Sequence, residues 1–141
     1  MIAYFDTSAL VPLFLDEPLT SAAWQLWDEA ERSVSSLLVR VEARAALARA
    51  VRTGRLEVDD LARALDAFER LAEELFLMDV TPGLIDHAAG VADQEGLLAY
   101  DAVHLASAEL LDIEDVVLVT GDRLLADAAG RRGLAAADFT R

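Results

Sequence analysis

The chain has 141 residues, of which 55% are hydrophobic, enough to bury one core and too many for a disordered chain. It lacks cysteine, which excludes disulfides, thiolate zinc sites and cysteine nucleophiles, and it lacks the run of about eighteen apolar residues that a membrane span needs. Twelve basic residues, all arginine, face 26 acidic ones; the net charge of −14 argues against a general nucleic-acid binder and favours partners such as metal or a basic protein.

Apolar periodicity, together with capping and turn residues, predicts alternating strands and helices. In chain order these are a strand over Ile2–Phe5, a helix from Asp6-Thr7-Ser8 to about Leu15, a helix over Ser21–Ala30, a strand over Ser33–Ser36, and a long helix capped by Ser36 and ended near Arg52 by Thr53-Gly54. The second half adds a helix from Asp59 to about Leu75, a strand within Leu75–Val80, a helix from Thr81-Pro82 to Glu95, a helix over Asp101–Leu111, a strand over Val116–Val119, a helix from Thr120-Gly121-Asp122 to about Gly130, and an edge strand over Leu134–Ala137.

This alternation predicts an α/β fold, with a parallel sheet covered by helices on both faces. We find no repeat, linker or low-complexity tract, so we expect a single domain over residues 1–141. The first residues lack the basic stretch of a signal peptide, and we expect a cytoplasmic protein.

Two predicted strands end at an acid. Asp6 follows the first strand and Asp122 follows the strand over Val116–Val119. Ligands of parallel α/β sheets bind beyond the carboxyl ends of the strands, so the two acids would face each other there if the strands are neighbours. Each acid is also a good helix cap, which is the alternative interpretation.

Glu42 is expected in the middle of a helix, and its neighbours one turn away are Leu38, Val39, Ala45 and Ala46. None of them can pair with its charge, so metal or an arginine from elsewhere in the fold would have to stabilise it. Asp101 begins a predicted helix, where capping is again the alternative. His104 follows one turn later, and we expect it in the core rather than at the site.

Carboxylates of this kind suit Mg²⁺ or Mn²⁺ rather than zinc. Clustered acids repel one another without a cation, and with one or two cations they can activate water for attack on a phosphodiester.

Four segments together resemble the motifs of PIN domains, in order and in spacing along nearly the whole chain. They are Tyr4-Phe5-Asp6-Thr7-Ser8-Ala9-Leu10, Val41-Glu42, Tyr100-Asp101-Ala102-Val103-His104-Leu105-Ala106 and Val119-Thr120-Gly121-Asp122-Arg123-Leu124-Leu125. The length is similar to that of VapC toxins, the ribonucleases of VapBC toxin–antitoxin pairs. The resemblance implies a three-layer α/β/α fold, Mg²⁺- or Mn²⁺-dependent ribonuclease activity, a homodimer and a VapB-type antitoxin.

By the same resemblance, Asp6, Glu42, Asp101 and Asp122 would bind metal and serve catalysis. Thr120 would support the site by hydrogen bonding, as would Thr7 or Ser8. Some PIN domains use a fifth acid, but Asp127 lies over a turn beyond Asp122 and we do not assign it a role.

Two other functions remain open at this stage. One is a phosphotransfer or phosphatase domain with Asp6 as nucleophile, although such domains normally use a lysine and this chain has none. The other is a non-catalytic PIN module. For the ribonuclease, transfer, ribosomal and messenger RNA all remain candidate substrates.

The charge also predicts a basic protein partner, which would insert an arginine or lysine into the acidic site. We expect its groove among the helices that carry Trp24, Trp27 and Glu42, unless the two tryptophans belong to the core.

Overall fold

A five-stranded parallel sheet forms the centre of the molecule in the computed structural model, which describes residues 1–15 and 20–139. Its strands run in the order β3-β2-β1-β4-β5. Their bounds are β1 Ile2–Phe5, β2 Arg32–Ser36, β3 Phe76–Met78, β4 Val116–Thr120 and β5 Ala135–Asp138. The chain adds β2 and β3 on one side of β1 and then crosses to β4 on the other side, so the order switches between β1 and β4.

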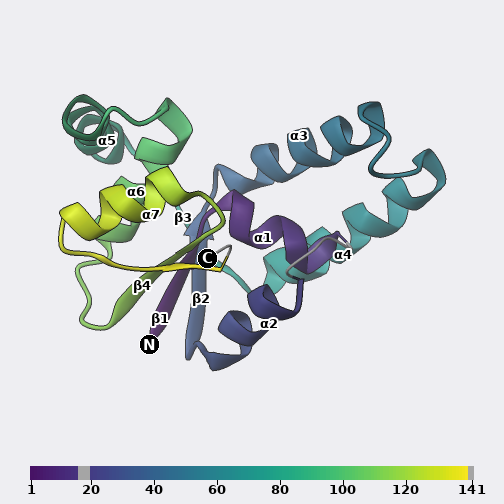
Figure 1. Cartoon of the computed structure of the whole chain (residues 1–141), viewed down its shortest axis with the longest axis horizontal. Coiled ribbons are helices and arrows are strands. Elements are labelled where there is room, and N and C mark those ends of the chain that lie inside the picture. The colour runs from purple at the N-terminus through teal and green to yellow at the C-terminus, as the bar shows by residue number, and fades with distance from the viewer. Residues whose placement is uncertain (16–19, 140–141) are drawn as a thin grey trace.

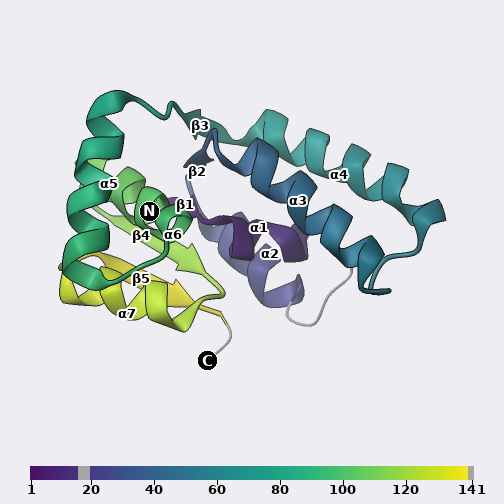
Figure 2. The ribbon, with the colours of Figure 1, turned by 90° about the horizontal axis from the view of Figure 1, so that it is seen from above.

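Helices cover both faces of this sheet. Their bounds are α1 Thr7–Phe14, α2 Thr20–Glu29, α3 Val39–Arg52, α4 Leu61–Glu74, α5 Pro82–Glu95, α6 Ala99–Leu110 and α7 Arg123–Arg131, with a 3-10 turn at Val58–Asp60. Helices α1 to α4 lie on one side and α5 to α7 on the other (Figure 1). Seen from above, α3 and α4 run side by side as an arm that projects away from the sheet (Figure 2). The expected three-layer α/β/α fold is therefore confirmed.

Alternating side chains of the strands supply two separate cores. In β1, Ala3 and Phe5 are fully buried against α1, α3 and α4, whereas Tyr4 points into the core beneath α5, α6 and α7. Burial on both faces explains why the run Ile2–Phe5 is almost entirely apolar. Among the described residues, no helix has the length and apolar character needed to cross a membrane.

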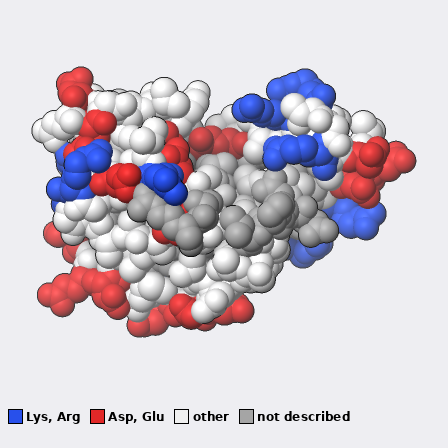
Figure 3. All heavy atoms as spheres, in the orientation of Figure 1, with Lys and Arg blue, Asp and Glu red and all other residues white. Residues whose placement is uncertain are grey.

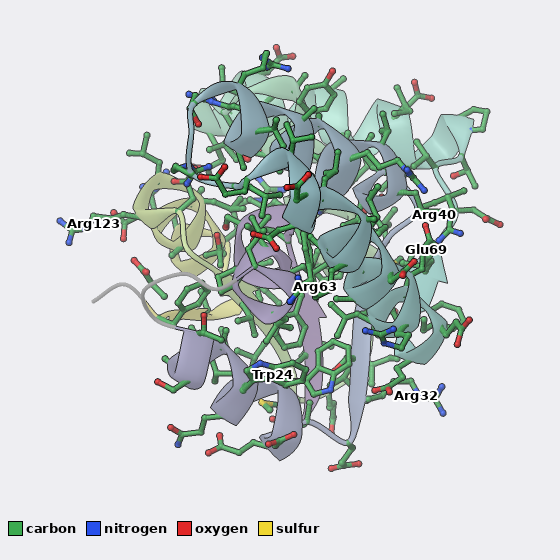
Figure 4. All side chains as sticks on the ribbon, turned by 90° about the vertical axis from the view of Figure 1, so that its right-hand side faces the viewer. Trp24, Arg32, Arg40, Arg63, Glu69 and Arg123 are labelled. Carbon is green, nitrogen blue, oxygen red and sulfur yellow. The ribbon has the colours of Figure 1, made fainter. Side chains whose placement is uncertain are left out.

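The two tryptophans of α2 have different environments. Trp27 packs against Phe5, with ring centroids 5.4 Å apart, and belongs partly to the core. Trp24 packs edge-on against Trp27 and is 37% exposed. Figure 4 labels it at α2, in the view from the right-hand side of Figure 1. Trp24 is therefore the more exposed member of the pair, and among the described residues α3 packs mainly against α1 and α4.

Most predicted bounds agree with the structure to within two residues, but the long helix after β2 begins later than expected. The Ser36 hydroxyl accepts a hydrogen bond from the Leu38 N–H and holds a turn, and α3 then begins at Val39. Glu42 consequently lies in the first turn of α3, not in its middle. This position brings it to the carboxyl edge of the sheet, beside β1.

Candidate active site

Asp6 is held rigidly at the end of β1. Its Oδ1 accepts hydrogen bonds from the Ser8 hydroxyl at 2.7 Å and the Ala9 N–H at 2.9 Å, and its Oδ2 accepts one from the Thr120 hydroxyl at 2.7 Å. The side chain is only 3% exposed. Burial raises the pKa of this carboxyl, while His104 and these three hydrogen bonds act in the opposite direction.

The end of β4 is joined to Asp6 through Thr120. Strands β1 and β4 are neighbours, with Phe5 beside Val119, so Thr120 reaches Asp6 directly. The Thr120 Oγ1 also accepts the Asp122 N–H at 2.9 Å. Asp122 in turn caps α7, its Oδ1 accepting the N–H groups of Leu124 and Leu125 at 2.8 and 3.3 Å. The capping interpretation thus holds for Asp6 and for Asp122, and both acids still lie at the strand-order switch.

Gly121 allows the loop after β4 to approach α1 closely. Its N–H donates to the Ser8 hydroxyl at 2.9 Å, and a Cβ at this position would lie 3.2 Å from the Phe139 ring and 3.5 Å from the Ser8 Oγ. A side chain here would need the Phe139 ring to move by a few tenths of an ångström.

Glu42 reaches the same edge from α3, and histidine rather than arginine is its partner. The His104 Nε2 lies 2.6 Å from the Glu42 Oε1, and the Thr7 hydroxyl donates to that oxygen at 2.8 Å. The Tyr4 hydroxyl lies 2.9 Å from the His104 Nδ1. Because an ionised carboxylate can only accept, Nε2 is the donor in the contact with Glu42. Burial acts to raise the pKa of Glu42, but the hydrogen bond and field of His104, with the Thr7 hydrogen bond, lower it overall.

Asp101 completes the group from α6. It lies in the first turn of that helix, whose capping residue is Leu98, so Asp101 is not a cap. No hydrogen bond to its side chain is found within residues 1–15 and 20–139. Burial raises its pKa to about 6, and the negative charges of Asp122, Asp6 and Glu42 contribute to this rise more than His104 opposes it. The charges of the other three predicted acids therefore act on Asp101.

These carboxylates suit a hard divalent cation, although they do not enclose one. Within the described part of the chain, no three acidic or histidine side chains stand ready to surround a metal ion. Mg²⁺ commonly needs only one or two protein carboxylates, the remaining positions being filled by water and substrate phosphate. Asp101 is half-buried, does not cap its helix and feels the charges of Asp6 and Asp122, which fits that kind of open site.

The sequence missed one residue of this arrangement. His104 was expected in the core, and it is indeed 2% exposed, but its ring also holds Glu42. Its position one turn after Asp101 was the available signal. Pairing this histidine with Glu42, which had no charge partner on its own helix, would have been the correct prediction. Asp127 lies further along α7 and its side chain is exposed.

Comparisons with known proteins agree with this fold. A model of the PIN domain matches residues 3–131, a range that contains all four acids. The chain is 38% identical over 134 residues to Ribonuclease VapC49 of Mycobacterium tuberculosis, covering 93% of each. It superposes on PAE2754 from Pyrobaculum aerophilum with a TM-score of 0.71 and 28% identity, over 96% of this chain and 92% of that one.

VapBC2 from Rickettsia felis, solved bound to a DNA fragment from its promoter, shares the fold with a TM-score of 0.64. Its identity is 15%, over 97% of this chain and 98% of that one, so this likeness concerns the fold alone. The family match and the curated relative together show that the chain belongs to the PIN-domain family, among its VapC-type ribonucleases.

Proposed function

We propose that this chain is the toxin of a VapBC-type pair and hydrolyses RNA phosphodiester bonds with Mg²⁺ or Mn²⁺ at Asp6, Glu42, Asp101 and Asp122. The observation that carries the proposal is the electrostatic coupling of the four acids. They come from the end of β1, from α3, from α6 and from the loop after β4, and the charges of the other three help to raise the pKa of Asp101 to about 6. Such a concentration of negative charge is costly unless a cation neutralises it.

Each residue has a distinct part in this proposal. When bound, a divalent cation supplies the positive charge that lowers the pKa of water and offsets charge on the phosphoryl oxygens. Asp6 and Asp101 would be its main ligands, and Asp122 would assist from the next loop. Thr120 and Ser8 fix the Asp6 carboxylate by hydrogen bonds, and Thr7 and His104 fix Glu42. Fixed ligands reduce the reorganisation needed when cation and substrate bind.

The alternative of Asp6 as a phosphorylated nucleophile is disfavoured by the same contacts. Both oxygens of Asp6 are engaged by hydrogen bonds, and the side chain is almost fully buried. A phosphorylated Asp6 would have to fit a phosphoryl group into this buried position, and the chain has no lysine to hold it, whereas a small cation needs only a remaining lone pair.

A homodimer and a VapB-type antitoxin belong to the same proposal. A toxic nuclease requires an inhibitor, and a chain with a charge of −14 attracts a basic partner over long range. We propose that an arginine or lysine of that partner enters the acidic site and pairs with the carboxylates where the cation would bind. Inhibition should then weaken as Mn²⁺ rises. An antitoxin whose tail has lost every basic residue, yet still silences cleavage fully, would refute this insertion.

The test of the proposed activity is cleavage of cellular RNA by the purified chain with Mg²⁺, with Mn²⁺ and with excess EDTA, followed by sequencing of the new RNA ends. Discrete ends that require the cation support the proposal. Full activity in EDTA, or an aspartyl phosphate trapped on Asp6, would overturn it.

A further inference from the structure

A groove lined by arginines opens beside the acidic site, between α1 and α3. It has a volume of about 790 Å³. Ser8 and Val11 line it from α1, and Ala45, Ala46, Arg49 and Arg52 line it from α3. Ser8 is the same residue whose hydroxyl donates to Asp6, so the groove begins where the acids are.

The charge of this region is the reverse of that of the whole chain. Residues 39–55 contain five arginines and a single acid, Glu42, within a protein of net charge −14. In Figure 3 basic side chains lie over α3, with acidic ones beside them at the tip of the arm; other basic side chains lie on the opposite side, and the lower edge of the molecule is acidic. The Debye length at physiological salt is about 8 Å, so these arginines act on a nearby ligand with little interference from distant acids.

The arginines of α3 fall into two groups. Arg40 and Arg44 pair with Glu69 of α4, at 3.4 and 3.3 Å, and so join the two helices of the arm. Figure 4 shows Arg40 and Glu69 close together on that side. Arg49 and Arg52 have no acidic partner among residues 1–15 and 20–139, and both are exposed. The helix dipole stabilises arginines in the last turn of α3. That effect alone does not require them to line a groove with Ser8.

One face of α3 leads from the acids to these arginines. Ala45, Ala46, Arg49 and Arg52 lie three, four, seven and ten residues after Glu42, and this spacing places all five along one side of the helix. With a rise of 1.5 Å per residue, Arg49 lies roughly 10 Å and Arg52 roughly 15 Å beyond Glu42 along the axis. The small side chains of the alanines between them leave room for an extended chain along this face of the helix.

We infer that this groove binds the sugar–phosphate backbone of single-stranded RNA on one side of the bond that is cut, with Arg49 and Arg52 holding successive phosphates. Guanidinium groups match phosphate oxygens bidentately, and such contacts position a nucleic acid without reading its sequence. The inference rests on the proposed ribonuclease function, and it explains how a strongly acidic protein holds a polyanion. The acids bind the RNA through a cation at the bond that is cut, and the arginines bind the flanking phosphates directly.

The test compares two double variants that remove the same charge. Arg49→Gln with Arg52→Gln empties the groove of these guanidiniums. Arg32→Gln with Arg70→Gln is the matched control, because both residues are exposed, neither lines the groove and neither has an ion pair within the described ranges. Binding of a fluorescent single-stranded RNA is measured by anisotropy over a salt series, in an Asp101→Asn background that prevents cleavage. Melting temperatures verify that every variant is folded.

The groove variant should bind RNA about 10- to 100-fold more weakly than the control, and its salt slope should be smaller by about 1.4, or 0.7 for each lost phosphate contact. The loss should shrink for a trinucleotide. Equal affinities and slopes for the two double variants would overturn the inference, and so would a groove variant that binds RNA normally but no longer binds the antitoxin. The proposed function is tested separately, since wild-type chain that cleaves no RNA refutes that function whatever the arginines do.

Discussion

The two sides of the acidic site are built differently. On the strand side, Asp6 is buried and both of its oxygens accept hydrogen bonds, while Asp122 caps a helix. On the helix side, Asp101 is half-buried and does not cap its helix. Its carboxylate accepts no hydrogen bond in the described part of the chain, and its pKa is raised to about 6. The strand side is complete as it stands, whereas the helix side carries a charge that the fold does not compensate.

This difference separates acids whose carboxylates are hydrogen-bonded within the fold from Asp101, whose charge has no such partner. Asp6 serves the fold as well as the proposed chemistry, because it links β1 to α1 and β4. Asp101 makes no side-chain hydrogen bond in the described part of the chain, and we expect repulsion from the other acids to weaken the fold. Function-driven residues often cost stability in this way.

The largest effect expected is on cleavage, and here the two sides should behave alike. Asp6→Asn and Asp101→Asn keep side-chain shape but remove ligand charge, so each should lower RNA cleavage by about 10³-fold or more, which corresponds to several kcal/mol of lost transition-state stabilisation. Asp127→Asn, outside the site, should cleave nearly as wild type. Initial rates on a fixed RNA measure this, and an active Asp6→Asn would show that the site is misplaced.

The support of Glu42 by His104 should be the next largest effect. His104→Leu removes the contact to the Glu42 Oε1, and we expect cleavage to fall by about 10- to 100-fold, the range typical for residues that orient a ligand. His104→Gln, whose amide can still donate, should recover part of the loss. If the two variants lose equal thermal stability but cleave like wild type, His104 is only a core residue.

Thr120→Val tests the strand side through stability. The substitution keeps volume but leaves the buried Asp6 Oδ2 without its donor and the Asp122 N–H without its acceptor. An unsatisfied buried group costs about 1–3 kcal/mol, so the chemical denaturation midpoint should fall clearly. A midpoint equal to that of wild type would contradict the rigid-anchor view of Asp6.

On the helix side, the charged Asp101 carboxylate should lower stability, and this effect should depend on pH. With a folded-state pKa near 6 against an unfolded value near 3.9, the folded chain binds more protons between these two values, so its stability should fall as the pH rises through this window and stay low above it. Solvent screening limits the loss to about 1–2 kcal/mol for a half-buried group. Denaturation in EDTA from pH 4 to 7 should show this slope in wild type and a flatter one in Asp101→Asn. Identical slopes would contradict the account.

Most of the fold was predictable because each element carries local signals. The apolar run of β1, the β-branched run of β4 and the caps at Asp6, Thr81 and Asp122 all act within a few residues, and the structure has them where the sequence indicated. The start of α3 was wrong by two residues because the Ser36 turn precedes the helix instead of beginning it.

The partners within the site were less predictable, because they depend on contacts between distant segments. Glu42 and His104 are 62 residues apart, and Asp6 and Thr120 are 114 apart. The sequence indicated that Glu42 needed a partner but suggested metal or arginine. Only the packing of α6 against the sheet shows that a histidine fills that place.

The most direct test of the central claim is the thermal melting of wild type and Asp101→Asn at about pH 7.5, each in EDTA and in excess Mn²⁺, where a ligand at 100 times its Kd adds about 2.7 kcal/mol. We predict that Asp101→Asn melts higher than wild type in EDTA, and that Mn²⁺ raises the wild-type melting temperature by several degrees but that of the variant much less. If both proteins melt alike in EDTA and respond equally to Mn²⁺, Asp101 neither strains the fold nor binds the cation, and the account is contradicted.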